Sequence, residues 1–153
     1  RNNPGCHALI RRYIAFRTRR LIMIRYCKDA KLTVEEVIDL YVRSTLGERR
    51  PIHNKGTFEA MLKNANLTIT AWDQDKLIGI ARSLTDFGYV NYLADLAVDQ
   101  EYQRRGIGKE LIVQTQKYLG PDCMIVLLAA PKANEYYEHI GFEHNPRAWT
   151  LTK

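Results

Sequence analysis

Two glycines stand one residue apart within a basic stretch of the chain, which runs Arg104, Arg105, Gly106, Ile107, Gly108, Lys109. The apolar periodicity that follows predicts a helix over 106–118, so both glycines fall at its first turn. The first N–H groups of a helix lack partners within the helix, and the helix dipole puts partial positive charge there. Glycines remove the side chains that would keep a ligand off these amides. The stretch is therefore typical of a site for a phosphate-type anion.

Two common phosphate-binding patterns do not fit this stretch. A P-loop requires glycine at 103 and Ser or Thr after the lysine, where the chain has Gln103 and Glu110. A dinucleotide fingerprint counted from Gly106 requires glycine at the position of Leu111. Taken alone, the glycines are equally compatible with a tight strand-to-helix turn that binds nothing.

The residues around the glycines carry a family resemblance. The run YLADLAVDQEYQRRGIGKELI resembles the acetyl-CoA-binding motif of the GNAT superfamily of N-acetyltransferases, in which a strand, a short loop and Gly-x-Gly open a helix. The later run LLAAPKANEYYEHIGFE is similar to the second block of that family. The resemblance covers residues 23–153 and indicates a small single-domain member of bacterial type.

The resemblance implies acetyl-CoA as the acetyl donor. The amides of Arg104–Lys109 would hold its pyrophosphate, and the pantetheine amides would pair with unpaired backbone groups of Leu96, Ala97 and Val98 on a splayed strand. Asn134 matches a family position that contacts the cofactor arm, although it is also an ordinary polar residue for the first turn of a helix.

The reaction implied by the resemblance moves an acetyl group from the thioester to a primary amine of a small molecule, by direct attack in a ternary complex. Tyr137, four residues before Gly141, falls at the family's general-acid position and would protonate the departing thiolate. A backbone N–H near Val98 would stabilise the oxyanion. Two alternatives remain open: acetylation of a protein N-terminus or lysine, and a non-catalytic acyl-CoA sensor.

The general base is less defined by the sequence. Family members often use a carboxylate on this strand, and Asp95 is the acid within NYLADLAV, so it is the candidate catalytic base or amine anchor. Strict alternation places Asp95 on the opposite face from Tyr92, which is an alternative residue for positioning water. A bulge would change that assignment. A purely structural role for both residues also stays open.

The acceptor pocket is expected to form from the first two helices, the loop 46–57 that joins them and the strand around 89–92. That loop is basic, with Arg49, Arg50, His53 and Lys55. It is either a solvated loop or a site for an acceptor that bears a carboxylate or phosphate. The four histidines of the chain lack carboxylate or cysteine partners at ligand spacing, so no metal is expected.

The elements that must position these residues alternate between strand and helix patterns. Period-two runs predict strands, and apolar stripes at helical spacing predict helices, in the order β-α-α-β-β-β-α-β-α-β-β. The unit of strand 89–98, helix 106–118 and strand 123–129 is a crossover, which makes those strands parallel. The expected fold is a three-layer α/β (α+β) arrangement, a mixed, mostly antiparallel sheet with one splayed parallel pair and helices on both faces. The last two strands are expected in GFEH and AWTLT.

The net charge of +6 is located entirely in residues 1–22, which contain six arginines and no acidic residue. The remaining chain is formally neutral, so nucleic acid is not an expected partner. We treat residues 1–22 as a basic extension outside the fold (leader, tag or read-through) and 23–153 as one domain. No apolar run is long enough to span or anchor in a membrane. The expected location is cytoplasmic, or an organelle if the extension is a transit remnant. Dimerisation is common in the family, which leaves a homodimer open.

Overall fold

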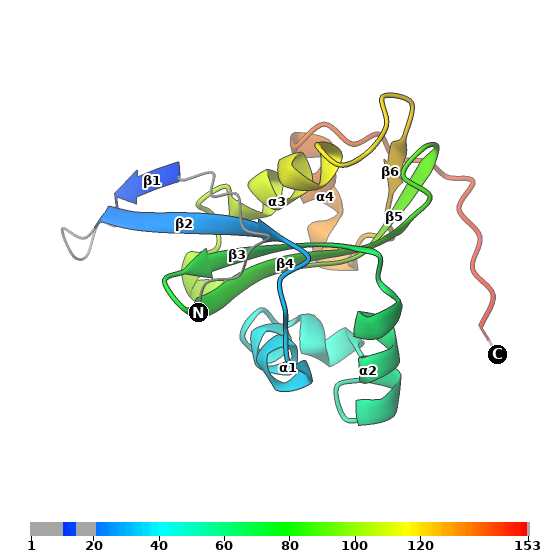
Figure 1. The fold of residues 1–153 in the computed structure, drawn as a ribbon. Helices are drawn as coiled ribbons and strands as arrows, with labels where there is room; N and C mark the ends of the chain where they lie inside the picture. Colours follow the sequence, from blue (N-terminus) through cyan, green and yellow to red (C-terminus); the bar gives the residue numbers. More distant parts are fainter. Residues whose placement is uncertain (1–10, 15–20, 153) are drawn as a thin grey trace.

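A mixed six-stranded sheet forms the centre of the computed structural model, which describes residues 11–14 and 21–152 (Figure 1). The strands lie in sequence order across the sheet. They are β1 (Arg11–Ile14), β2 (Leu21–Lys28), β3 (Leu67–Asp73), β4 (Lys76–Thr85), β5 (Val90–Val98) and β6 (Met124–Val126). Neighbours are antiparallel except β5 and β6, which are parallel. The predicted mixed sheet with one parallel pair is confirmed.

Helices cover both faces of this sheet and make three layers, as the sequence predicts (Figure 1). The α-helices are α1 (Val34–Arg43), α2 (Lys55–Asn64), α3 (Ile107–Gln116) and α4 (Asn134–His139). Short 3-10 turns lie at Leu46–Arg49, Gln100–Tyr102 and Pro131–Ala133. Helices α1 and α2 lie on one face, and α3 and α4 lie on the other. No helix in the described ranges is both long and apolar enough to cross a membrane.

Each helical layer has its own apolar contact with the sheet. Helix α1 begins with a capping box, in which Glu36 N–H donates to Thr33 Oγ1 at 3.2 Å and Glu36 Oε2 accepts from Thr33 N–H at 2.8 Å. Its Val37 and Leu40 are fully buried against β4 and β5. On the other face, buried residues of α3 pack against the four central strands, since their side chains form one apolar cluster.

The pairing of β4 with β5 contains a bulge. Arg82 pairs with Asp95 and Ser83 pairs with Leu93, so Ala94 is an extra residue on β5. A bulge reverses the alternation of side chains beyond it. Consistent with this, Leu93 packs in the cluster beneath α3, whereas Ala97 packs beneath α1.

The parallel pair opens after three residue pairs. The register runs from Val90 opposite Met124 to Tyr92 opposite Val126, while β5 itself continues to Val98. The far side of residues 93–98 therefore has no neighbouring strand within the described residues. The splayed pair predicted from the sequence is present.

The C-terminal expectations are wrong. Residues 141–152 form no strand, and Trp149 and Leu151 are 94% and 99% exposed. The strand expected at 123–129, buried on both faces, is instead three residues long with Met124 49% exposed. A strand is held by neighbours and a buried face, and β6 has a neighbouring strand on the β5 side alone among the described residues.

The boundary drawn at residue 22 also needs correction. β1 pairs antiparallel with β2, from Arg11 opposite Ile24 to Ile14 opposite Leu21. These backbone hydrogen bonds make 11–14 and 21–22 part of the sheet, although their composition differs from the rest of the domain. The remainder of the basic extension, 1–10 and 15–20, lies outside the described residues.

Candidate active site

The first turn of α3 has the geometry expected of an anion site. Gly106 is its N-cap with φ of 76°, a left-handed conformation that suits glycine, and no side chain caps the helix. The buried Ile107 fixes the turn to the core. Arg105 is turned aside, because it donates to the Glu101 carbonyl at 2.7 Å. The amides at the helix start are thus bare of side-chain caps.

Gly108 is required by its surroundings. A Cβ at this position would lie 2.7 Å from the hydroxyl oxygen of Tyr136 and 3.8 Å from Val98 Cγ2. Helix α4 therefore brings Tyr136 directly over the start of α3. Asn134, the first residue of α4, is exposed.

The backbone of β5 beyond the pairing with β6 offers groups to a ligand, but not at all three predicted residues. Asp99 N–H donates to Ile78 carbonyl at 2.9 Å, so the preceding ladder pair joins Ala97 to Ile80. The backbone N–H and C=O of Ala97 therefore point toward β4, away from the gap, so Ala97 does not fit the predicted cofactor contact. Leu96 and Val98 face the gap, where the Gln103 side chain donates to the Val98 carbonyl at 3.0 Å.

Tyr137 lies on the inner side of α4. Its ring packs edge-on against Phe142, with centroids 5.5 Å apart. Burial raises the pKa of Tyr137, with a further contribution from Tyr136. The positive charges of Arg49 and Arg50 act against this rise, which places Tyr137 within electrostatic reach of the loop before α2. The net rise keeps the phenol protonated at neutral pH, as a general acid requires.

Asp95 does not have the surroundings of a general base. It is 1% exposed, and both carboxylate oxygens accept hydrogen bonds. The donors are Tyr41 Oη at 2.7 Å, Arg82 Nε at 2.5 Å and the Arg50 guanidinium. Asp95 thus lies behind the arginines, and it is not among the residues that line the adjacent hollow. The predicted base role is therefore corrected: Asp95 orients the two arginines.

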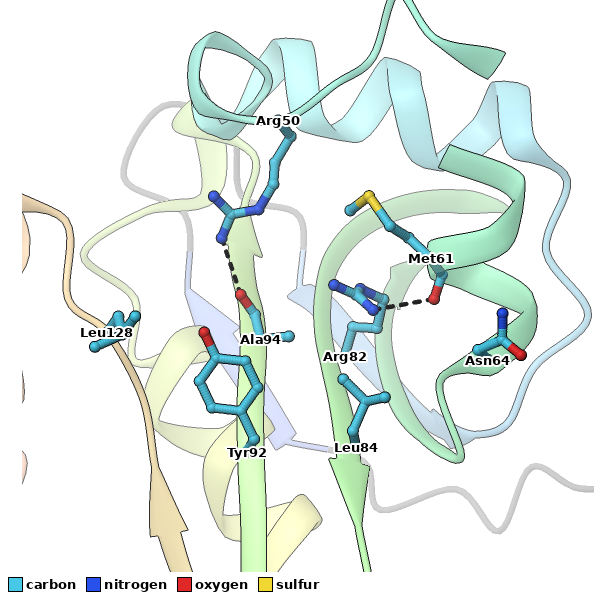
Figure 2. A pocket seen from close by; sticks show the side chains of 8 residues that line it. All are labelled: Arg50, Met61, Asn64, Arg82, Leu84, Tyr92, Ala94 and Leu128. Atoms are coloured by element: carbon cyan, nitrogen blue, oxygen red, sulfur yellow. Dashed lines mark hydrogen bonds between the residues drawn. The ribbon is translucent and has the colours of Figure 1, made fainter. Parts of the chain in front are cut away.

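These arginines open onto a hollow of about 480 Å³ beside the splayed strands (Figure 2). Figure 2 shows Arg50 reaching in from the loop and Arg82 from β4, with Tyr92 on β5. The full lining is Arg50, Met61, Asn64, Arg82, Leu84, Tyr92, Ala94 and Leu128. Leu128 belongs to the segment that follows β6, so the hollow reaches the gap between β5 and that segment.

The predicted acceptor region is found only in part. Arg50 and Tyr92 line the hollow, whereas Arg49, His53 and Lys55 are not among the lining residues. Lys55 instead pairs with Glu35 at 3.0 Å on the surface. Asp95 and Tyr92 lie on the same face, contrary to strict alternation, because the bulge intervenes.

Arg82 was missed as part of the site, whereas the second helix was expected there and contributes Met61 and Asn64 to the lining. A signal was present for Arg82: it is a cation within the otherwise apolar run LIGIARSL, which predicts a buried partner. The apolar spacing of the second helix indicated that Met61 faces inward, but no signal marked Asn64, because the residues that reach the hollow depend on how α2 packs. The bulge residue Ala94, whose carbonyl accepts from Arg50 at 2.9 Å, was also unmarked.

Comparison with known proteins assigns the family. A model of the acetyltransferase (GNAT) domain matches residues 40–148. An uncharacterized N-acetyltransferase, ycf52, of Pyropia yezoensis is 28% identical over 130 residues, covering 78% of this chain and 73% of the relative. The chain belongs to the GNAT acetyltransferase family.

Solved structures agree with this assignment. A protein of meticillin-resistant Staphylococcus aureus, named a probable acetyltransferase, superposes with a TM-score of 0.70 at 26% identity, covering 86% of this chain and 98% of that one. The aminoglycoside N-acetyltransferase AAC(6')-Iy, solved with CoA, gives 0.68 at 20% identity, covering 89% and 98%. At that identity it shows the fold alone. The chain spans only 29–33% of the length of the first curated relatives it matches, which are acetyltransferases of Arabidopsis thaliana and Glycine max.

Proposed function

We propose that this protein transfers an acetyl group from acetyl-CoA to the primary amine of a small molecule. The observation that carries the proposal is the gap beside residues 93–98, which has an uncapped helix start at one end and a lined hollow at the other. A long, jointed donor with a diphosphate in its middle and a thioester at its tip matches that layout.

The residues present fit coenzyme A. The amides at Gly106–Lys109 suit the pyrophosphate, because no side chain caps them and Gly106 adopts a left-handed conformation. The groups of Leu96 and Val98 that face the gap suit the pantetheine amides, as an added strand would. The solved relative AAC(6')-Iy is described with CoA, which supports the same cosubstrate here.

The chemistry is then direct attack by the acceptor amine on the thioester carbonyl. The amine displaces the thiolate of coenzyme A through a tetrahedral intermediate, and Tyr137 gives its phenolic proton to the departing sulfur. The acceptor amine loses its proton to water in the hollow, since Asp95 is buried behind the arginines and does not line the hollow. Tyr92, whose ring lines that hollow, is suited to orient the water.

A direct test is thiol release from acetyl-CoA with a panel of amines, together with calorimetric binding of CoA. Gly106→Asp places a carboxylate where the diphosphate would sit, so CoA affinity should fall at least about tenfold. Gly56→Asp adds the same charge in the first turn of α2, where a Cβ meets nothing nearer than Asn54 Oδ1 at 3.8 Å. Equal CoA affinity in both variants would refute the assignment of the diphosphate site to the start of α3.

A non-catalytic acyl-CoA sensor is the second candidate, and one observation bears on it. Tyr137 is half-buried with a raised pKa, within electrostatic reach of Arg50, and a sensor does not need a proton donor at this place. Tight CoA binding with no thiol release for any amine or peptide would favour the sensor. Release with peptides alone would favour acetylation of a protein.

A further inference from the structure

We infer that the hollow at Arg50 and Arg82 takes a primary amine that also carries one carboxylate, such as an amino acid, rather than a polycationic amine. This rests on the proposed acetyl transfer and names the class of its acceptor. Both charged side chains that line the hollow are cationic, and none of its eight lining residues carries a carboxylate. A site for a polyamine or an aminoglycoside would need acidic groups there.

The arginines are held in position from behind. Arg82 donates to Asp95 at 2.5 Å and, through Nη1, to the Met61 carbonyl at 3.0 Å. Arg50 donates to Asp95 and, through Nη2, to the Ala94 carbonyl at 2.9 Å. A guanidinium carries five N–H bonds, so these contacts fix each head and leave donors for a ligand. The entropy cost of ordering these long side chains therefore falls on folding and not on ligand binding.

The orientation of the heads favours a planar anion. In Figure 2 the guanidinium group of Arg50 lies at β5 beside Ala94 and that of Arg82 lies between β5 and helix α2, and both residues line the same hollow. Guanidinium groups bind a carboxylate through two parallel N–H···O bonds, and such charge-assisted bonds are stronger than neutral ones. Only 6% of Arg82 is exposed, so water competes weakly for its free edge.

The charge of the cluster selects a single negative charge. Two guanidinium groups and the carboxylate of Asp95 leave one positive charge, which one carboxylate neutralises. A phosphate monoester carries about −1.5 to −2 at neutral pH and would leave the site negative. A polyamine would add positive charges to a cationic site, where burial weakens screening by salt.

The rest of the lining is largely apolar. Met61, Leu84 and Leu128 line the same hollow as the arginines, and the volume of about 480 Å³ is ordinary for a small-molecule site. An amino acid with an apolar side chain, such as leucine, satisfies both the cationic and the apolar parts. Its α-amine would then face the gap near Leu128, where the thioester is expected.

The experiment compares acceptors that differ in one group. Leucine and isopentylamine share the amine and the branched body, and only leucine has the carboxylate. Thiol release with acetyl-CoA should give leucine a kcat/KM roughly ten- to a hundredfold above that of isopentylamine. Spermidine and O-phosphoethanolamine should both fall below leucine.

Two variants locate the effect. Arg50→Gln removes donors from the hollow and should reduce the advantage of leucine to below about threefold, mainly through KM. Arg49→Gln removes the same charge one residue away, outside the lining, and should keep the advantage. Circular dichroism and thermal unfolding verify that both variants are folded.

Binding measured by calorimetry in the presence of CoA separates this inference from the proposed function. Equal kcat/KM for leucine and isopentylamine, or a preference for spermidine or O-phosphoethanolamine, overturns the inference while leaving acetyl transfer intact. If no amine is acetylated, the proposed function fails, and binding then decides: tighter binding of leucine than of isopentylamine supports the carboxylate site. Equal binding, or none, overturns it.

Discussion

Tyr92 and Asp95 lie on the same face of β5 although they are three positions apart, because Ala94 between them is the extra residue of a bulge. Tyr92 lines the hollow, and Asp95 accepts a hydrogen bond from Arg82, which lines it too. The bulge thereby joins one residue from each half of the strand into a single site. It lies next to the point where β6 leaves β5, after the pair of Tyr92 and Val126.

The buried ion cluster predicts a large effect of Asp95→Asn on stability. The change leaves two arginine heads without their shared carboxylate in a site where Asp95 is 1% exposed. Breaking a buried pair by removing one partner costs about 3–5 kcal/mol, which urea unfolding would measure. Asp39→Asn is the matched control, because Asp39 pairs with Arg43 while its side chain is 66% exposed, and it should cost less than about 1 kcal/mol. Equal costs for the two variants would contradict the cluster's role.

The contact between Gly108 and Tyr136 predicts a rescue. Gly108→Ala places a methyl group 2.7 Å from Tyr136 Oη, with the next ring atom 3.6 Å away. The ring must move across the start of α3, so CoA affinity should fall roughly tenfold or more. Adding Tyr136→Phe removes the clashing oxygen and should restore most of the affinity.

Gly56→Ala is the control for that pair of variants. A methyl group at Gly56 meets nothing closer than 3.8 Å within helix α2, so it should stabilise the fold by about 0.5–1 kcal/mol and leave CoA binding unchanged. Calorimetric titration measures the CoA affinity of Gly108→Ala, of the double variant and of Gly56→Ala. A double variant no better than Gly108→Ala would show that the hydroxyl is not the obstacle.

Tyr137→Phe tests the general acid. Turnover should fall roughly 10²- to 10⁴-fold with CoA affinity little changed, because only proton transfer to the thiolate is removed. Burial raises the pKa of Tyr137, so in the native enzyme its loss of a proton should lower kcat only above pH 10. Tyr118→Phe, on an exposed ring that lies 5.2 Å from Lys28 Nζ, is the control. A fully active Tyr137→Phe enzyme would remove this role.

The hydrogen bonds of Asp99 predict how the stability of the fold depends on pH. Burial raises the pKa of Asp99, but the hydrogen bonds that it accepts outweigh burial and hold the pKa below its ordinary value of 3.8. The donors are Lys76 Nζ at 3.0 Å, Glu101 N–H at 3.0 Å and the Arg43 guanidinium. Because the pKa of Asp99 is lower in the folded state than in the unfolded state, its carboxylate stabilises the fold fully at pH values above the unfolded-state pKa. This stabilisation is lost as the pH falls through the folded-state pKa.

Asp99→Asn should therefore cost about 1–3 kcal/mol at neutral pH and flatten the decline in stability below pH 4. Urea unfolding from pH 2.5 to pH 7 measures both quantities. Asp122→Asn, in the exposed turn before β6, is the control and should leave the profile unchanged. A variant with the native acid profile would show that Asp99 does not set it.

Several parts of the molecule could be predicted from the sequence because their causes are local. The capping box at Thr33 and Glu36, the helix that begins after Gly106 and the crossover between parallel strands each depend on residues close in the chain. The family motif around Gly106 and Gly108 likewise predicted the expected donor and the helix start that would hold its diphosphate.

The acceptor side could not be predicted in the same way. The faces of Tyr92 and Asp95 follow from one extra residue, and strict alternation predicted them wrongly. The terminal runs GFEH and AWTLT have a strand pattern but no neighbour to pair with among the described residues. A period-two pattern states which residues would share a face, and a strand exists only where another strand supplies its hydrogen bonds.

The family, the order of the elements from β2 to α4 and the glycine-rich helix start at Gly106 and Gly108 follow from the sequence alone, because short-range pattern and backbone chemistry carry them. The contacts of Asp95 with Arg50 and Arg82, and the place of Arg82 in the lining of the hollow, are visible only in the folded chain. The physical reason is distance along the chain: these charges come from β4, β5 and the loop before α2, and only folding brings them within hydrogen-bond reach.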